Sequence, residues 1–221
     1  LDLIDNLKIK SKNYSFVKFD CSKGLKSEQL LKKILKLKGV PDAFVNLSYP
    51  SNNQWSKSSF KKINYKNFKN NLEIHLASYS WSAKIIADQM VKKKVKGSIV
   101  LMSSIYSLVA QDIQMYNKTN LTENFSYPII KGGINALTKQ LASYYGKFSI
   151  RINAICLGGI QGKVKGKNIN QDRLFVKRYK SKTFLKRMCN TNDVFGPIYF
   201  LTSDLSSYVT GSLLVVDGGY T

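Results

Sequence analysis

Residues 97–104 read GSIVLMSS, and residues 126–146 read SYPIIKGGINALTKQLASYYG. The first stretch is a short apolar run that ends in two serines, which is typical of a buried strand in a parallel sheet. The second places apolar residues at helical spacing, at Ile130, Ile134, Leu137 and Leu141. Because Pro128 is tolerated only in the first turn of a helix, we expect this helix to begin at about Ser126 or Tyr127. A strand followed by such a helix indicates a parallel α/β sheet.

The same alternation extends in both directions along the chain. Short apolar runs predict strands at residues 14–20, 42–46, 98–103, 149–155 and 213–216. Apolar periodicity predicts helices at residues 27–38, 67–93 and 127–146, within a lysine-rich segment at 162–182, and at 193–201. No repeat or low-complexity linker divides the chain. We therefore expect one domain over residues 1–221, of the α/β class.

The composition is that of a globular protein. The chain has 221 residues, of which 43% are hydrophobic and 22% charged. It has no run of about 18 apolar residues, as a transmembrane helix needs, and its first residues do not read as a secretory signal. The three cysteines, Cys21, Cys156 and Cys189, form no Cys-x-x-Cys pair and accompany a single His. We therefore expect no metal site, and reduced thiols in a cytoplasmic protein.

The formal net charge of +22 raises the question of nucleic-acid binding. Only four of the 35 basic residues are Arg, which is the residue favoured for bidentate contacts to phosphate and guanine. The lysines are also spread along the whole chain. We therefore expect solvated lysines rather than a nucleic-acid site. The alternative, a polyanion-binding protein, requires the lysines to gather on one face.

Tyr127 and Lys131 stand four residues apart at the start of the expected helix, so their side chains lie on one face. A nearby ammonium favours the phenolate form of a tyrosine, so Lys131 is expected to lower the pKa of Tyr127. A Tyr tuned toward neutral pH can exchange a proton with a carbonyl or an alcohol. The pair indicates acid–base chemistry, although the same spacing also arises by chance.

Further motifs surround this pair. RINAI at residues 151–155 leads to Gly158-Gly159-Ile160, and the end of the chain reads FLTSD at 200–204, YVTG at 208–211 and VVDGG at 215–219. In this order and at these intervals, from Asp20 to Thr221, the chain resembles the short-chain dehydrogenase/reductase family. The resemblance implies a Rossmann-type three-layer sandwich with a parallel sheet, and a homodimer or homotetramer. It also implies NAD or NADP as cofactor, and hydride transfer between a secondary alcohol and a ketone of a small molecule.

The resemblance also implies roles for single residues. Tyr127 takes the position of the catalytic acid/base, Lys131 that of the residue that binds the nicotinamide ribose, and Ser104 that of the hydrogen-bond partner of the substrate oxygen. The cofactor side is expected to consist of Asp20 at the adenine, Asn46 at the adenosine ribose, and Gly158, Gly159 and Ile160 at the nicotinamide amide.

Three positions depart from the family pattern. The Asn that the family carries on the long helix is His75 here, and we expect His75 to act as a site residue in its place. A count that differs by one turn would select Asn71 instead. Leu157 stands where the family has Pro, and residues 46–49 read NLSY where it has Asn-Asn-Ala-Gly.

The largest departure lies before Asp20, where no glycine-rich turn for a pyrophosphate is present. A first strand–helix–strand unit of about 30 residues is expected there, and the chain opens on Leu1 rather than Met. We therefore interpret the chain as part of a longer protein, without the first βαβ segment of the fold, so that residues 16–19 have no strand to pair with. The alternative is a non-catalytic relative that lost its cofactor site. The residues that select NAD or NADP are not in the chain.

The substrate is indicated less directly. Residues 46–50, 75–77, 104–106 and 131–134 together resemble a subgroup associated with the synthesis of bacterial surface and flagellar sugars. That resemblance implies a sugar or sugar phosphate as substrate. The long stretch between Ser104 and Tyr127 carries polar residues able to bind hydroxyls, namely Gln111, Asp112, Tyr116, Asn117, Thr119 and Asn120. A 3-oxoacyl thioester reductase is the alternative, which an apolar loop would favour.

Overall fold

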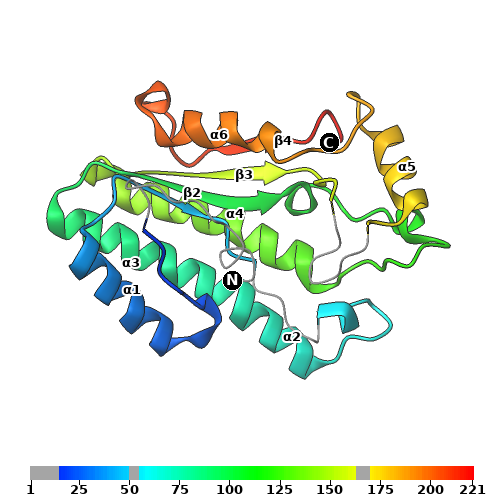
Figure 1. Cartoon of the computed structure of the whole chain (residues 1–221), viewed down its shortest axis with the longest axis horizontal. Coiled ribbons are helices and arrows are strands. Elements are labelled where there is room, and N and C mark those ends of the chain that lie inside the picture. Colours follow the sequence, from blue (N-terminus) through cyan, green and yellow to red (C-terminus); the bar gives the residue numbers. More distant parts are fainter. Residues whose placement is uncertain (1–14, 50–54, 163–169) are drawn as a thin grey trace.

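The computed structural model describes residues 15–49, 55–162 and 170–221 and contains a parallel sheet. Its four strands, in the order β1-β2-β3-β4, are Ala43–Asn46, Ser98–Ser104, Arg151–Leu157 and Leu213–Val216 (Figure 1). Four of the five expected strands are thus confirmed to within two residues. Because all four run in one direction, their carboxyl ends lie at the same edge of the sheet.

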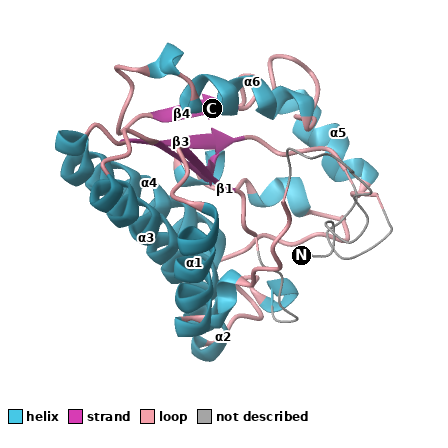
Figure 2. Cartoon of the chain, turned by 60° about the vertical axis from the view of Figure 1, so that its left-hand side comes forward, coloured by secondary structure: helices cyan, strands magenta, loops and turns pink. Residues whose placement is uncertain are grey.

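Helices cover both faces of the sheet and make a three-layer sandwich (Figures 1 and 2). On one face, α1 (Leu25–Lys38), α3 (Ser78–Lys93) and α4 (Ser126–Tyr145) enclose an apolar core with Ile99, Leu101, Ile152 and Ala154. On the other face, α6 (Asn192–Thr202) packs Leu201 against Val100 and Ile155. Successive strand residues therefore serve opposite cores, as the two-residue period of a strand requires. The expected Rossmann-type sandwich is confirmed.

The expected helix at residues 67–93 is interrupted. It consists of α2 (Tyr65–Leu72), a π-helical turn (Glu73–Ala77) and α3. A π turn inserts one residue into the helical repeat and often lies at a functional site. His75 lies in the middle of this turn, so the turn decides which way its imidazole faces.

The expected strand at residues 14–20 is wrong for the part that the structure describes. Residues 15–20 have no regular structure, and Phe16 is 51% exposed; Tyr14 lies outside the described residues. Among the described residues, β1 pairs only with β2. A strand needs a neighbour to satisfy its N–H and C=O groups, and residues 15–20 have no such neighbour within the described part of the chain.

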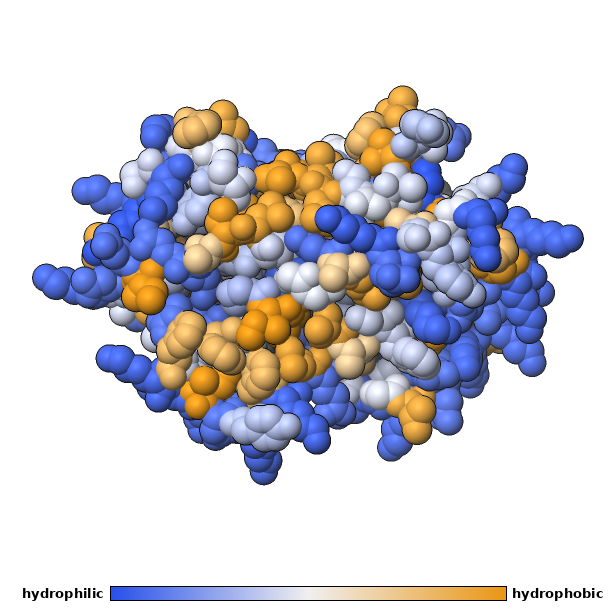
Figure 3. Space-filling view, turned by 180° about the vertical axis from the view of Figure 1, so that it is seen from behind, coloured by the Kyte–Doolittle hydropathy of each residue, from blue (hydrophilic) through white to orange (hydrophobic). Residues whose placement is uncertain are grey.

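The lysine-rich segment contains the helix that was expected within residues 162–182. Its helix, α5, covers only Arg173–Lys182, and Asp172 begins it by accepting the amides of Leu174 and Phe175 at 2.9 and 3.2 Å. Residues 163–169 lie outside the described residues. Figure 3 shows the face opposite to that of Figure 1, with apolar side chains in its middle and hydrophilic ones on all sides of them.

The described residues contain no helix both long and apolar enough to span a membrane. They also contain no cluster of three or more His, Cys, Asp or Glu side chains able to hold a metal ion.

Candidate active site

Tyr127, Lys131 and Ser104 lie together where β2 ends. Ser104 is the last residue of β2 and is 4% exposed, and Tyr127 is the second residue of α4, which packs on β2. The Tyr127 hydroxyl is hydrogen-bonded to the Ser104 side chain. Pro128 falls in the first helical turn, as expected, and α4 begins at Ser126. The structure thus brings together the three residues that the sequence assigned to the reaction.

Lys131 is held by the same strand. Its Nζ donates to the Met102 carbonyl at 2.8 Å, and its own carbonyl accepts the Ser103 hydroxyl at 3.1 Å. The Nζ also lies 5.6 Å from the centroid of the Tyr127 ring. The side chain is 7% exposed, and this burial lowers the pKa of Lys131 to about 8. With its pKa lowered to about 8, Lys131 still carries its ammonium charge at neutral pH, where the Met102 carbonyl accepts one of its protons.

The pKa of Tyr127 was expected to be lowered, and this prediction is wrong in this structure. Burial raises the pKa of Tyr127 above its ordinary value, and the hydrogen bond with Ser104 opposes this only in part. The reason is that removing a phenolate from water costs more than one hydroxyl partner returns. Tyr127 is therefore a protonated phenol at neutral pH, which is a proton donor.

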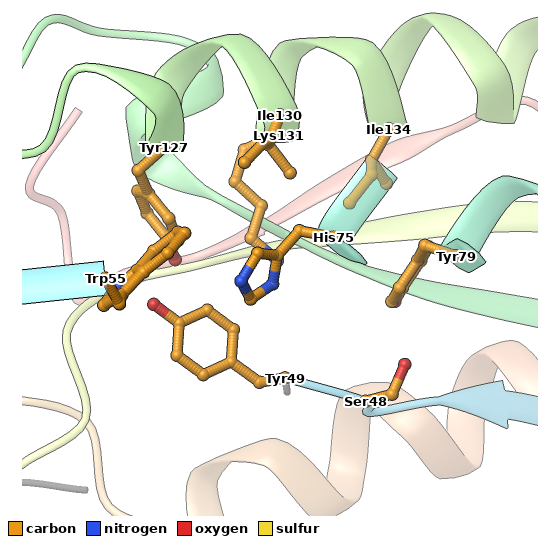
Figure 4. Close-up of a pocket in the computed structure, with 9 residues that line it drawn as sticks. All are labelled: Ser48, Tyr49, Trp55, His75, Tyr79, Tyr127, Ile130, Lys131 and Ile134. Carbon is orange, nitrogen blue, oxygen red and sulfur yellow. The ribbon is translucent and has the colours of Figure 1, made fainter. Parts of the chain in front are cut away.

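His75 faces the same place from the π turn (Figure 4). It is 4% exposed and lines a small cavity with Tyr127 and Lys131. Its ring centroid lies 4.4 Å from that of Trp55 and 5.3 Å from that of Tyr49. His75, chosen by counting to the position where the family carries Asn, therefore lies beside Tyr127 and Lys131. Asn71, which is 0% exposed, faces the start of α4 instead.

Sequence reasoning missed three aromatic residues of the cavity. Tyr49 and Trp55 stand edge-on to Tyr127, with centroid distances of 6.3 and 6.2 Å. Tyr79 lies deeper, and its hydroxyl bonds the carbonyl of Asn46 and accepts the amide of Met102 at 2.6 Å. Tyr79 thereby links the ends of β1 and β2. Tyr79 could have been predicted from the sequence, because it stands four residues after His75 and residues four apart share one face of a helix.

Two residues expected on the cofactor side serve local turns. Asp20 caps the 3₁₀ turn Cys21–Lys23, and its Oδ1 accepts the amide and hydroxyl of Ser22 at 3.0 and 2.7 Å. These bonds with Ser22 outweigh the cost of burial and hold the pKa of Asp20 below its usual value. Asn46 ends β1, and its Oδ1 accepts the amide and hydroxyl of Ser48 at 3.1 and 2.6 Å. Neither residue lines the Tyr127 cavity.

The glycines after β3 are required by packing. A Cβ on Gly158 would lie 2.9 Å from the Asp217 Cα, and one on Gly159 would lie 2.9 Å from the Tyr179 ring. The Gly159 amide donates to the Tyr179 hydroxyl. Ile160 forms a bridge with Cys189. The close approach at these positions is therefore made by α5 and by the segment after β4.

The loop between Ser104 and Tyr127 is held mainly by its own polar groups. Asp112 caps a 3₁₀ turn and pairs with Lys182 at 2.7 Å, while the carbonyl of Asn117 accepts Arg178. Met115, 1% exposed, packs in an apolar cluster with Phe175 and Tyr179. Gln111, Thr119 and Asn120 also bond within the protein. The loop is thus held against α5.

The side chains at this site match a nicotinamide nucleotide better than the space beside them does. The donor set fits, because a phenol, a serine hydroxyl and a lysine ammonium converge on one spot. The room beside them is about 10 Å³, no more than one water needs, since Tyr49 and Trp55 stand there. The structure therefore supplies the groups that would react, but a nicotinamide ring would fit only if Tyr49 and Trp55 moved.

Comparison with known proteins places this geometry in context. A family model described as enoyl-(acyl carrier protein) reductase matches residues 3–221. Post-translational flagellin modification protein A of Campylobacter coli is 34% identical over 183 residues, which are 81% of this chain and 67% of that protein. L-rhamnose 1-dehydrogenase (NAD(P)(+)) of Sphingomonas sp. (strain SKA58) is 33% identical over 66% of this chain. The chain spans 54% of that enzyme's length.

A solved structure has the same arrangement. The short-chain dehydrogenase of Leptospira borgpetersenii with bound NAD+ superposes with a TM-score of 0.83 at 28% identity. The similarity covers 97% of this chain and 79% of that one. The sheet, its flanking helices and the order of elements are therefore those of a known dinucleotide-binding fold.

Proposed function

Because this chain belongs to the short-chain dehydrogenase/reductase family, we propose that it interconverts a secondary alcohol and a ketone with NAD or NADP. The observation that carries the proposal is the convergence of Ser104, Tyr127 and Lys131 at the carboxyl end of β2. Ligands of open α/β sheets bind at that edge. The pattern of one hydroxyl donor, one hydroxyl partner and one ammonium suits a reaction that moves a proton at an oxygen atom.

The proton belongs to Tyr127. In the reductive direction, its hydroxyl gives a proton to the substrate carbonyl oxygen, which becomes the alcohol oxygen. In the oxidative direction, the phenolate takes that proton back. The Ser104 hydroxyl holds the same oxygen, and Lys131, near the Tyr127 ring, favours the phenolate when the proton leaves. A bound nicotinamide would supply or accept the hydride at the carbon, with Lys131 at its ribose.

We propose a sugar or sugar phosphate as substrate, for the synthesis of a surface glycan. Two relatives support this: one is named for flagellin modification and the other for oxidation of L-rhamnose.

A 3-oxoacyl thioester reductase is the second candidate. The description of the matching family model names an acyl carrier protein. The choice between the two classes depends on which substrate the protein turns over.

A substrate panel tests the proposal. The protein, expressed from its complete coding sequence, is mixed with NAD+ or NADP+ and a set of sugars and sugar phosphates, and with NADH or NADPH and 3-oxoacyl thioesters, while absorbance at the nicotinamide band is followed. We expect turnover with at least one sugar and little with the thioesters. Turnover with thioesters alone would replace the sugar proposal, and none with either set would contradict both.

We further propose a cytoplasmic homo-oligomer. All three cysteines of the chain are free thiols, as in a reducing compartment. Large apolar side chains stand exposed on two neighbouring helices, with Trp81 of α3 at 50% and Tyr144 of α4 at 58%. We propose that a second copy of the chain covers these two helices. Light scattering of the purified protein measures its mass directly, and a monomer would contradict the proposal.

A further inference from the structure

Three polar side chains meet in the interior next to the start of α4. Asn71 of α2 donates through Nδ2 to the Ser126 hydroxyl at 3.1 Å and to the Ser58 hydroxyl at 2.9 Å. All three residues are 0% exposed. Buried polar groups are costly unless they are hydrogen-bonded, so a bonded cluster like this one fixes the elements that it joins.

The elements joined are the helix of His75 and the helix of Tyr127. Ser126 is the first residue of α4 and directly precedes Tyr127. Asn124, from the adjoining loop, accepts the amides of Ser126 and Tyr127 at 3.0 Å each, which starts the helix but fixes it only to its own loop. Asn71 and Ser58 provide contacts to the rest of the protein, together with the Phe125 amide on the Ser58 carbonyl at 2.8 Å.

Lys131 is anchored elsewhere. Its contacts run to β2, through the carbonyl of Met102 and the hydroxyl of Ser103. The first turn of α4, which carries Tyr127, is thus tied to α2 through Ser126, and the next turn, which carries Lys131, is tied to β2. The distance between their side chains depends on both anchors.

We propose that Asn71 is a positioning residue for Tyr127, setting the place of its hydroxyl relative to Ser104 and Lys131. The proposal rests on the acid–base function proposed for Tyr127. Without the Asn71 amide, Ser126 and Ser58 lose a buried donor, and the first turn of α4 is free to shift. The rate of an enzyme reaction can fall roughly 10²-fold when a catalytic group is displaced by about 1 Å.

The test compares Asn71→Ala with a matched control. Asn153 is also 0% exposed, donates to the Val209 carbonyl at 2.8 Å and accepts the Ser212 amide at 3.0 Å, but lies on the far side of the core. Asn153→Ala therefore removes a buried amide without touching α4. Ser126→Ala, which deletes one hydroxyl, serves if Asn71→Ala does not fold.

Two readouts are measured on each variant. With the substrate found by the panel, kcat is expected to fall roughly 10–100-fold in Asn71→Ala, with cofactor KM within about twofold of the parent. Separately, 3-fluorotyrosine at position 127 is titrated by ¹⁹F NMR without cofactor. Its hydroxyl should titrate at higher pH in Asn71→Ala and in Ser126→Ala, because the Ser104 bond that lowers its pKa is weakened.

The outcomes separate the two proposals. A ¹⁹F titration of Asn71→Ala, or of Ser126→Ala in its place, that matches both the parent and Asn153→Ala would overturn the positioning function, whatever the activity. The ¹⁹F titration of either variant could be shifted although the parent protein turns over no alcohol or ketone. That result would support the positioning of Tyr127 by Asn71 and would contradict only the proposed function. Equal losses of kcat in Asn71→Ala and Asn153→Ala would mean general destabilisation and would also overturn it.

Discussion

The reaction side and the cofactor side of this molecule are built differently. Ser126, the neighbour of Tyr127, is bonded to Asn71 of α2, and Lys131 is bonded to Met102 of β2. The side chains of Asp20 and Asn46, which are expected at the cofactor, accept bonds from Ser22 and Ser48, two residues away along the chain. A side chain held across the fold has one position, whereas one held by its own turn mainly shapes that turn. The acid–base groups are therefore the better-determined part of the site.

The largest expected effect that sharpens this comparison is that of Lys131→Met on catalysis. The variant keeps the length of the side chain and loses the ammonium. We expect kcat to fall roughly 10²-fold or more, with weaker cofactor binding, because the ammonium favours the Tyr127 phenolate and is expected at the ribose. Steady-state kinetics with varied cofactor measures both. Loss of cofactor affinity with an unchanged kcat would leave Lys131 a binding residue only.

The same variant should make the protein more stable. The folded pKa of Lys131 is about 8, below the ordinary value of about 10.4, so the unfolded chain binds more protons between these pH values. The contribution of Lys131 to the free energy of unfolding therefore rises from pH 8 to pH 10.4. Below pH 8 the full cost of burying the ammonium applies, and Lys131→Met removes it, a gain of up to roughly 3 kcal/mol.

Urea unfolding of parent and variant at pH 7 and pH 10.5 measures this difference. The gain should be largest at pH 7 and small at pH 10.5. A variant less stable than the parent at pH 7 would show that the ammonium is well satisfied in the folded protein.

His75 gives an intermediate effect. His75→Asn should keep most of the activity, because the amide is a polar group of similar reach at the position where the family carries Asn. His75→Ala should lose roughly tenfold in kcat, as the removal of one positioned polar group does. Both rates are measured at saturating cofactor. Equal rates for His75→Ala and the parent would remove His75 from the site, and a collapse in a folded His75→Asn would mean that the imidazole itself is needed.

The smallest effect is expected on the cofactor side. Asp20→Ala should change kcat and cofactor KM less than about twofold, while costing about 1 kcal/mol of stability through loss of the turn cap. Ser22→Ala, which removes a partner of the same carboxylate, is the control and should cost less. A cofactor KM raised tenfold or more in Asp20→Ala alone would place Asp20 at the cofactor after all, and would break the contrast between the two sides.

Much of the fold could be read from the sequence, and the reasons for the failures are physical. Apolar runs and periodicity located four strands and the main helices, because burial dictates those patterns. Residues 15–20 carry the same pattern but have no partner strand, and pairing is not a property of one segment. The pKa of Tyr127 was expected to follow its charged neighbour, yet burial dominates. Burial depends on the whole fold and cannot be predicted from the spacing of Tyr127 and Lys131.

The site shows the same limit. Tyr127 and Lys131 were found because their spacing along one helix is local, and Ser104 was found through the resemblance of the motifs around it to the family. Tyr49, Trp55 and Tyr79 were missed because they reach the cavity from loops and from the helix after the π turn. The π turn rotates His75 and Tyr79 relative to Asn71, and no pattern of residue types predicted that turn.

One measurement tests the assignment of Tyr127 most directly. Tyr127→Phe and Tyr144→Phe each remove one hydroxyl from α4, the first inside the site and the second on the 58% exposed Tyr144. With the parent as reference, kcat at saturating cofactor and the Kd for NADH or NADPH are determined on the same samples. We expect Tyr127→Phe to lose roughly 10³-fold or more in kcat at nearly unchanged Kd, and Tyr144→Phe to match the parent. A Tyr127→Phe protein that retains most of the parent's kcat would contradict the acid–base function of Tyr127.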